Sequence, residues 1–306
     1  MASAAVPSTA ATPLPRPRIP ALSGEWKSLL FVLPYLAVYV VLLIVPLFLS
    51  ISYSLFKADL FGIEAFVGLR NYARLIHDAV FLRTVLNTLL FVLMTVPALA
   101  VIGLVLALLL NRQTRVAAAL RAIFFSSTVL SVTVVALIWR MVFIPEGGLV
   151  ATIRAMFHQQ PINFLNSEQL ALPAVAVTTI WWCIGLPMML FLAALQQVPR
   201  ELYEAAALDR TSKWRTLWHI TLPSIRRTVL LVLVIEVILQ LQLFGQSQLM
   251  TLGGPNNASR PVVLWIYEAA FRQWDLGYAA AGAQVLFAMI LIAAGLQFRI
   301  ARQKER

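Results

Sequence analysis

The sequence contains few charged residues for its size. Only 12% of its 306 residues are Asp, Glu, Lys or Arg, whereas 60% are hydrophobic and the mean hydropathy is +0.83. A soluble domain of this length needs far more polar surface to cover its core. The excess of apolar side chains indicates an integral membrane protein whose segments face lipid.

Residues that build catalytic and metal sites are also scarce. The one cysteine, Cys183, lies inside an apolar run, so no disulfide or thiolate metal site forms within the chain. The three histidines are scattered, and no His-Glu-x-x-His motif occurs. No glycine-rich loop ends in Gly-Lys-Ser or Gly-Lys-Thr, so the chain is not expected to hydrolyse ATP. These absences favour a non-catalytic protein with no metal and no cofactor of its own.

Basic residues outnumber acidic ones by 24 to 13, which gives a net charge of +11. Such a balance also occurs in nucleic-acid-binding proteins, where the cations form one stripe. Here the cations gather at the ends of apolar runs, as in the cytoplasmic loops of membrane proteins. We therefore expect membrane lipid and no nucleic acid as a partner.

Six apolar segments have about the length that crosses a bilayer as a helix. They are Leu29–Leu55, Thr84–Leu110, Ala122–Val142, Leu170–Leu195, Thr228–Phe244 and Tyr278–Ile300. Because the runs are continuously apolar and do not alternate, they predict helices and not a barrel. The predicted fold is all-α, with a transmembrane domain over residues 27–300, a flexible Pro-rich tail over 1–26 and a short tail over 301–306.

The distribution of Lys and Arg predicts the orientation. Two thirds of these residues fall in the two tails and in the second and fourth loops. Cytoplasmic loops carry the excess of positive charge, so both termini are predicted to be cytoplasmic.

The fourth loop, residues 196–227, carries a motif on its first predicted helix. The stretch Glu204-Ala-Ala-Ala-Leu-Asp209, followed after a spacer by Ile220-Thr-Leu-Pro223, resembles the EAA loop of ABC importer permeases. In that family the loop forms a coupling helix that docks into a cleft on the cytoplasmic ATPase. The resemblance implies ATPase contact for Glu204, Ala205, Ala206, Leu208, Asp209 and Arg210. The alternative interpretation of the fourth loop is a solvent-exposed amphipathic hairpin whose charges only keep the protein oriented in the membrane.

The motif departs from the family at Arg210, where glycine is usual. Glycine adopts a left-handed turn cheaply, whereas arginine does so at a cost. Either the turn is built differently here, or Arg210 forms an ion pair with the ATPase.

The resemblance extends over most of the chain after about residue 27. Phe66-Val-Gly-Leu-Arg-Asn-Tyr72, Leu192-Ala-Ala-Leu-Gln196 and Thr251-Leu-Gly-Gly-Pro255 are similar to stretches of the carbohydrate permease branch. The resemblance implies a second permease subunit, two cytoplasmic ATPases that bind ATP and Mg²⁺, and an extracytoplasmic solute-binding protein. It also implies a bacterial or archaeal cytoplasmic (inner) membrane.

Polar side chains inside the fifth predicted span are candidate ligands for a solute. Glu236 and Gln240 are four residues apart on one helical face, which Leu243 and Phe244 extend. Carboxylate and amide groups suit sugar hydroxyls, and an aromatic ring stacks on the apolar face of a sugar. Alternatively, Glu236 pairs with a basic residue of a neighbouring subunit or lies protonated in the bundle.

The fourth span supplies a second candidate face, at i, i+3, i+4 and i+7 spacing. It consists of Thr179, Trp182, Cys183 and Leu186, and Thr128 on the third span is a weaker candidate. Gly185 and Pro187 are expected to kink the fourth span.

We expect a sugar, oligosaccharide or polyol as the solute. A glycerol-phosphate ester is the nearest alternative. A function of another class is a membrane scaffold or regulatory subunit, which needs neither the motif-bearing loop nor a polar face in a span.

Overall fold

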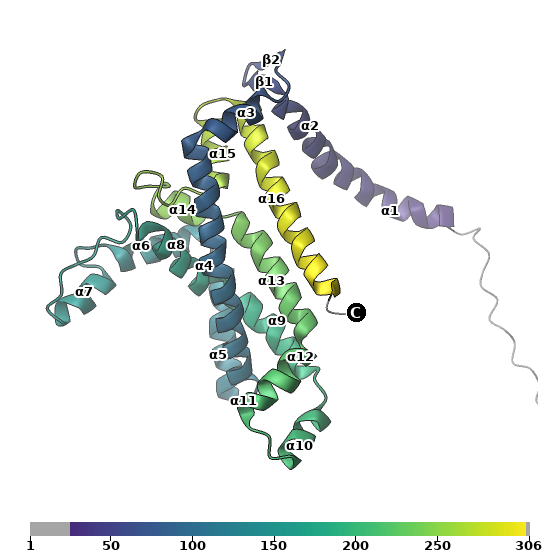
Figure 1. The fold of residues 1–306 in the computed structure, drawn as a ribbon, viewed down its shortest axis with the longest axis vertical. Helices are drawn as coiled ribbons and strands as arrows, with labels where there is room; N and C mark the ends of the chain where they lie inside the picture. The colour runs from purple at the N-terminus through teal and green to yellow at the C-terminus, as the bar shows by residue number, and fades with distance from the viewer. Residues whose placement is uncertain (1–24, 304–306) are drawn as a thin grey trace, which may run out of the picture. The chain divides into compact units, whose positions relative to one another are not determined.

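The computed structural model describes residues 25–303, and the chain divides into two units between residues 49 and 50 (Figure 1). The described part of the first unit is helical. Its elements are α1 (Glu25–Tyr39), a π-helical turn η1 (Val40–Ile44) and the start of α2 (Val45–Ser54). The continuous run Phe31–Ser54 has the length and hydropathy of a membrane span. Most of its large apolar side chains are exposed, as contact with lipid or another subunit requires.

The second unit is a helical bundle organised around one long helix. Its principal helices are α4 (Ala79–Leu110), α9 (Gly185–Gln196), α13 (Arg226–Leu241) and α16 (Leu276–Gln303). Helix α4 packs against α9 and α13, and α13 packs against α16 (Figure 1). The core therefore runs along α4, where Phe91 and Leu99 are fully buried.

The close approach of α4 and α9 depends on Gly103. A Cβ atom at this position would lie 3.0 Å from the Pro187 Cβ atom and 3.2 Å from the Met188 backbone nitrogen. Because lipid tails are as apolar as leucine, helix association in a membrane relies on such close packing of small residues.

Two apolar segments that we predict as single spans are broken. The segment Leu170–Leu195 forms α8 (Ala171–Cys183) and α9, which meet at an angle of 44°. The kink next to Gly185 is the one that the sequence predicts. The segment Ala122–Val142 bends far more, by 103°. It consists of α5 (Arg115–Ser126), a 3-10 turn η2 (Ser127–Val129) and α6 (Val132–Phe143).

The sharper break corrects our prediction of one straight helix over Ala122–Val142. Hydroxyl groups bond to backbone groups at the break, which offsets part of the cost of leaving the helix. The Ser127 hydroxyl donates to the Phe124 carbonyl at 2.9 Å, and the Ser131 hydroxyl accepts from the Val134 N–H at 3.4 Å.

Among the described residues, three helices are long and apolar enough to cross a membrane, or five if each bent pair is one span. Helix α13 corresponds to the fifth predicted segment, but its 16 residues fall short of the roughly 20 that a perpendicular crossing needs. The six-span count and the orientation stay predictions. The predicted N-terminal tail lies outside the described residues except for 25 and 26, where α1 begins. Helix α16 continues to Gln303, and residues 304–306 lie outside the described range.

A small β-hairpin departs from the all-α prediction. Strands β1 (Phe56–Asp59) and β2 (Gly62–Phe66) pair antiparallel. The Asp59 carboxylate accepts hydrogen bonds from the N–H groups of Phe61 and Gly62, and Gly62 has a φ of +138°. An aspartate turn completed by glycine is a hairpin signal that the surrounding apolar pattern conceals.

Short helices complete the second unit. They are α3 (Arg70–His77), α7 (Leu149–Met156), α14 (Gly245–Met250) and α15 (Val262–Phe271). Helix α14 packs against α6, and α15 packs against α16 and α4.

Candidate functional site

The motif-bearing loop folds into a helical hairpin at one end of the bundle (Figure 1). Its elements are α10 (Arg200–Leu208), α11 (Lys213–Thr216), a π-helical turn η3 (Leu217–Thr221) and α12 (Leu222–Ser224). Pro199 precedes α10 and Glu201 stands in its first turn, where a carboxylate complements the helix dipole. The sequence predicts this pair of helical stretches joined around Asp209–Thr211.

Most of the motif lies on the surface of α10. Ala206 is buried, and the exposed motif residues are Glu204, Ala205, Leu208, Asp209 and Arg210. Leu208 is 86% exposed beside two carboxylates. An exposed leucine next to charges is suited to contact with another protein.

Arg210 ends α10 in the left-handed conformation that glycine usually provides. Its φ is +49°, its N–H donates to the Ala207 carbonyl at 3.1 Å, and the Thr211 N–H donates to the Ala206 carbonyl at 2.9 Å. These two bonds form a Schellman motif, which satisfies the last carbonyls of a helix. The turn therefore has the left-handed conformation that glycine usually provides, although an arginine occupies the position.

Replacing Arg210 by glycine should stabilise the hairpin by about 1 kcal/mol, because a left-handed arginine is strained. We expect slower proteolysis of the loop and a higher thermal midpoint, with uptake at the wild-type rate. Reduced uptake with unchanged or greater stability would instead support an ion pair between Arg210 and a partner.

A side-chain contact joins the two halves of the hairpin on the side that faces α4. The hydroxyls of Tyr203 and Thr221 lie 3.3 Å apart, and a cavity of about 450 Å³ separates α10 from Leu108 of α4. On the outer side, Trp214 and Trp218 stack edge to face, with ring centroids 5.8 Å apart. Both indoles are more than half exposed.

The candidate solute-binding residues of the fourth span lie where the two broken segments meet. The Trp182 indole N–H donates to the Leu130 carbonyl at 3.1 Å, and the Ser127 hydroxyl lies 3.1 Å from the Trp182 carbonyl. Gly185 permits this contact. A Cβ atom there would lie 2.8 Å from the Phe124 carbonyl oxygen and 3.0 Å from the Thr128 methyl group. Breaks in transmembrane helices free backbone groups for binding, as at the sites of many transporters.

Glu236 and Gln240 form a hydrogen-bonded pair on α13. The Gln240 amide donates to the Glu236 carboxylate at 3.0 Å, and the two residues are 1% and 4% exposed. The Cys183 thiol lies close to both side chains. The structure thus brings together candidates from the fourth and fifth predicted spans.

The predicted residues divide into two sets by exposure. Four are covered by the chain itself, namely Thr179, Glu236, Gln240 and Leu243. Five retain part of their surface, namely Thr128, Trp182, Cys183, Leu186 and Phe244. Residues of the second set therefore retain surface for contact with a solute or another subunit, whereas those of the first set do not.

Two polar or aromatic residues at this site escaped the sequence analysis. The buried Gln246 amide donates to the Thr179 hydroxyl at 3.4 Å, and the Tyr267 ring packs against Phe244 with centroids 5.3 Å apart. Gln246 belongs to α14, beyond the end of α13 at Leu241, so no helical spacing connects it with Gln240. A glutamine two residues after the fifth predicted segment was the available signal.

Substituting Gln240 by alanine should lower solute-stimulated transport at least about fivefold without reducing assembly with partner subunits. The change removes an amide from the site and leaves the Glu236 carboxylate without its partner, a penalty of about 1–3 kcal/mol. Transport and co-purification of partners are the measurements. The control is Gln242→Ala, because Gln242 is exposed and its side-chain amide donates to the Ile238 carbonyl of its own helix. A parallel loss of assembly would mark the pair as structural.

A family model described as "Binding-protein-dependent transport system inner membrane component" matches residues 73–306. The chain belongs to this family. The matched region includes α4, both broken segments, the hairpin at α10 and α16. Members of this family are membrane-embedded, multi-pass permeases of ABC transporters and are not themselves catalytic.

Curated relatives of this permease match nearly its full length. The permease protein SmoG of a sulfoquinovosyl glycerol transport system in Agrobacterium fabrum is 31% identical, covering 93% of both chains. The multiple sugar-binding transport permease MsmF of Streptococcus mutans is 34% identical, over 78% of this chain and 82% of the relative. UgpA of Yersinia enterocolitica, an sn-glycerol-3-phosphate permease, is 30% identical over 94% and 98%.

Solved structures share the fold of this permease. A chain of a bacterial ABC transporter that imports the acidic polysaccharide alginate superposes with a TM-score of 0.79 at 22% identity. The match covers 90% of this chain and 96% of the other. A chain of the alginate transporter in complex with an alginate-bound periplasmic protein gives a TM-score of 0.80 at 20% identity. The fold is therefore that of a type I ABC importer permease.

Proposed function

We propose that this permease forms half of the membrane pore of an ATP-driven importer for a sugar, oligosaccharide or polyol. The exposed motif on α10 is the observation that carries the proposal, because it offers a coupling surface that a scaffold would not need. The names of relatives support the solute class, since SmoG and MsmF belong to transport systems for a sugar glycoside and for multiple sugars.

The partners that we propose are a second permease, two ATPases and a solute-binding protein. The six predicted apolar segments would cross a bacterial or archaeal cytoplasmic membrane with both termini in the cytoplasm. Helix α13 would cross at reduced length between α4 and α16. ATP binding would close the ATPases and move the hairpins of both permeases, which turns the cavity outward, and hydrolysis would reset it.

The loop after α14 is the proposed contact for the solute-binding protein. Asn87 of α4 donates to the Asn257 and Arg260 carbonyls at 2.6 and 3.0 Å, and the Ser247 hydroxyl donates to the Ser259 carbonyl at 2.6 Å. Such bonds hold the loop in one conformation, and preorganised loops lose less entropy on binding.

A glycerol-phosphate ester is the second candidate solute. The identity to UgpA supports it, because that permease belongs to an sn-glycerol-3-phosphate system. A phosphate in the cavity needs cationic or N–H donors, which the second permease would have to contribute in part.

Purification of the permease from detergent-solubilised membranes of its native host tests the proposal. Co-purification of a second permease, an ATPase and a solute-binding protein is the expected result, and that binding protein is then screened against sugars and glycerol phosphates. Recovery of the chain alone, under conditions that keep a known importer intact, would favour the scaffold.

A further inference from the structure

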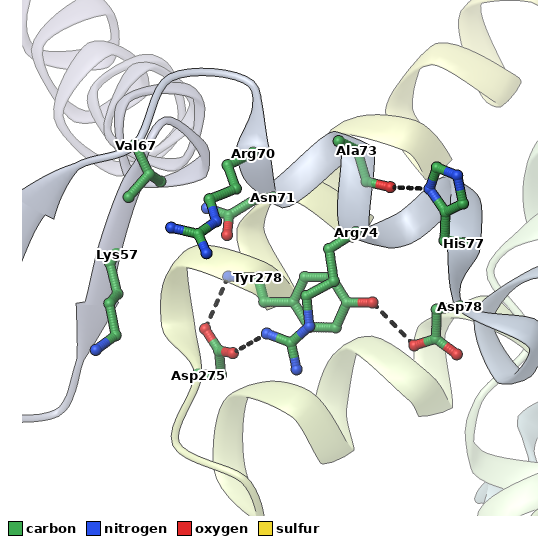
Figure 2. Close-up of a pocket in the computed structure, with 10 residues that line it drawn as sticks. All are labelled: Lys57, Val67, Arg70, Asn71, Ala73, Arg74, His77, Asp78, Asp275 and Tyr278. Atoms are coloured by element: carbon green, nitrogen blue, oxygen red, sulfur yellow. Dashed lines mark hydrogen bonds and ion pairs between the residues drawn. The ribbon is translucent and has the colours of Figure 1, made fainter.

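A pocket of about 780 Å³ opens where β1, α3 and the beginning of α16 meet (Figure 2). None of the candidate solute-binding residues lines this pocket. Its cationic lining residues are Lys57, Arg70 and Arg74. Asp78 and Asp275 are its acidic ones.

Two of the cations are neutralised by the protein itself. The Arg74 guanidinium lies 2.7 Å from the Asp275 carboxylate and 3.8 Å from the centre of the Tyr278 ring (Figure 2). The Lys57 ammonium lies 2.6 Å from the Glu64 carboxylate, and this hydrogen bond raises the pKa of Lys57. Asp78 in turn accepts from the Tyr278 hydroxyl at 2.9 Å.

Arg70 is the charge that remains. Its guanidinium projects into the pocket beside Asn71 (Figure 2) and has no hydrogen-bond or ion-pair partner within residues 25–303. The backbone below it is held firmly, because the buried Asn71 amide donates to the carbonyls of Ser54 and Phe56 at 2.9 and 3.0 Å. The Arg70 side chain itself is exposed. An uncompensated guanidinium at a pocket offers the paired N–H donors that suit an oxyanion.

The pocket lies at the N-terminal ends of two long apolar helices, α4 and α16. Both long helices begin there, since Asp78 caps α4 by accepting from the N–H groups of Val80 and Phe81, and α16 starts just after Asp275. Leu69, which directly precedes α3, and Ile76 of α3 are 70% and 67% exposed. Exposed apolar side chains beside cations, at the level where spans begin, are typical of a segment in the headgroup layer.

We propose that this pocket binds the phosphate of a glycerol-phosphate group, with Arg70 as its principal donor. The group comes either from an anionic lipid such as phosphatidylglycerol or from a soluble glycerol phosphate. The two sources present the same phosphate chemistry to the guanidinium. The acyl chains of the lipid would in addition contact the exposed side chains of α3. The site belongs to this chain alone and does not depend on the transported solute.

Lipid titration of the purified full-length permease, followed by native mass spectrometry, tests the site. We expect phosphatidylglycerol to bind more tightly than phosphatidylcholine, and Arg70→Gln to weaken phosphatidylglycerol binding about fivefold, the effect of one lost phosphate contact. Arg83→Gln is the matched control, since Arg83 is exposed at the start of α4 and does not line the pocket. It should change binding less than twofold. Arg70→Lys should restore part of the affinity.

Competition distinguishes the two sources. Displacement of the lipid by millimolar sn-glycerol 3-phosphate in the wild type, but not in Arg70→Gln, would assign the site to a soluble ester. Bound lipid that resists this competition would assign it to the headgroup. Equal losses in Arg70→Gln and Arg83→Gln, or equal binding of the two lipids, would overturn the proposal. It would also fail if Arg70→Gln weakened only the binding of a solute-binding protein.

Discussion

Charge reversal at Glu204 is expected to reduce solute uptake at least about tenfold while the permease still accumulates in the membrane. Glu204 is exposed on α10, so a lysine there leaves the fold of the hairpin intact. At a docked interface, however, the new cation faces groups selected for a carboxylate, and like charges or an unpaired buried charge cost several kcal/mol. A loss of 1.4 kcal/mol already corresponds to a factor of ten.

Glu201→Lys is the control for this result. Glu201 lies one turn earlier on α10, is equally exposed and stands outside the motif. We expect a smaller reduction, with uptake and ATPase co-purification measured for both variants in the same membranes. Wild-type uptake in Glu204→Lys would refute the coupling role of the hairpin, and equal losses in both variants would refute the specific role of the motif.

Replacing Gly185 by alanine is expected to destabilise the permease by about 1–3 kcal/mol, the usual cost of an extra methyl group in a packed core. The new methyl group would lie 2.8 Å from the Phe124 carbonyl oxygen and 2.9 Å from the Phe125 Cα atom. Because both neighbours belong to backbone, they cannot rotate away. The broken segments would be forced apart at the candidate site, so transport should fall together with the thermal midpoint.

Gly295→Ala provides the opposite expectation on α16. A Cβ atom at Gly295 meets no atom within 4 Å, and alanine is up to about 1 kcal/mol better than glycine inside a helix. This variant should therefore be as stable as the wild type or more so, as measured by thermal aggregation in detergent. A wild-type midpoint for Gly185→Ala would show that the contact between the breaks yields easily.

The two broken segments show how far the sequence could predict the bundle. The kink at Gly185 and Pro187 was predictable, because a glycine and a proline two residues apart in a span weaken the helix locally. The 103° bend between α5 and α6 was not. Its Ser and Thr residues suit helix contacts as well as a break, and only the carbonyl and indole of Trp182, more than fifty residues away, show which one forms.

The pocket around Arg70 shows the same limit at longer range. Arg74 pairs with Asp275, which lies 201 residues later in the chain. No spacing rule joins residues so far apart, and so the sequence could not tell which of the pocket's three Lys and Arg residues lacks a partner within residues 25–303.

The sequence by itself determined the membrane character of the protein, the approximate segments and the motif-bearing loop. These features depend on composition and on residues within a few turns of one another. The tertiary structure decided which polar residues of the spans are covered and which are exposed. The i, i+4 spacing places Glu236 and Gln240 on one face of α13, but not what packs against that face. Here other helices of the chain cover that face of α13. Exposed candidates lie where the helices are interrupted, because irregular backbone leaves space that regular, closely packed helices would fill.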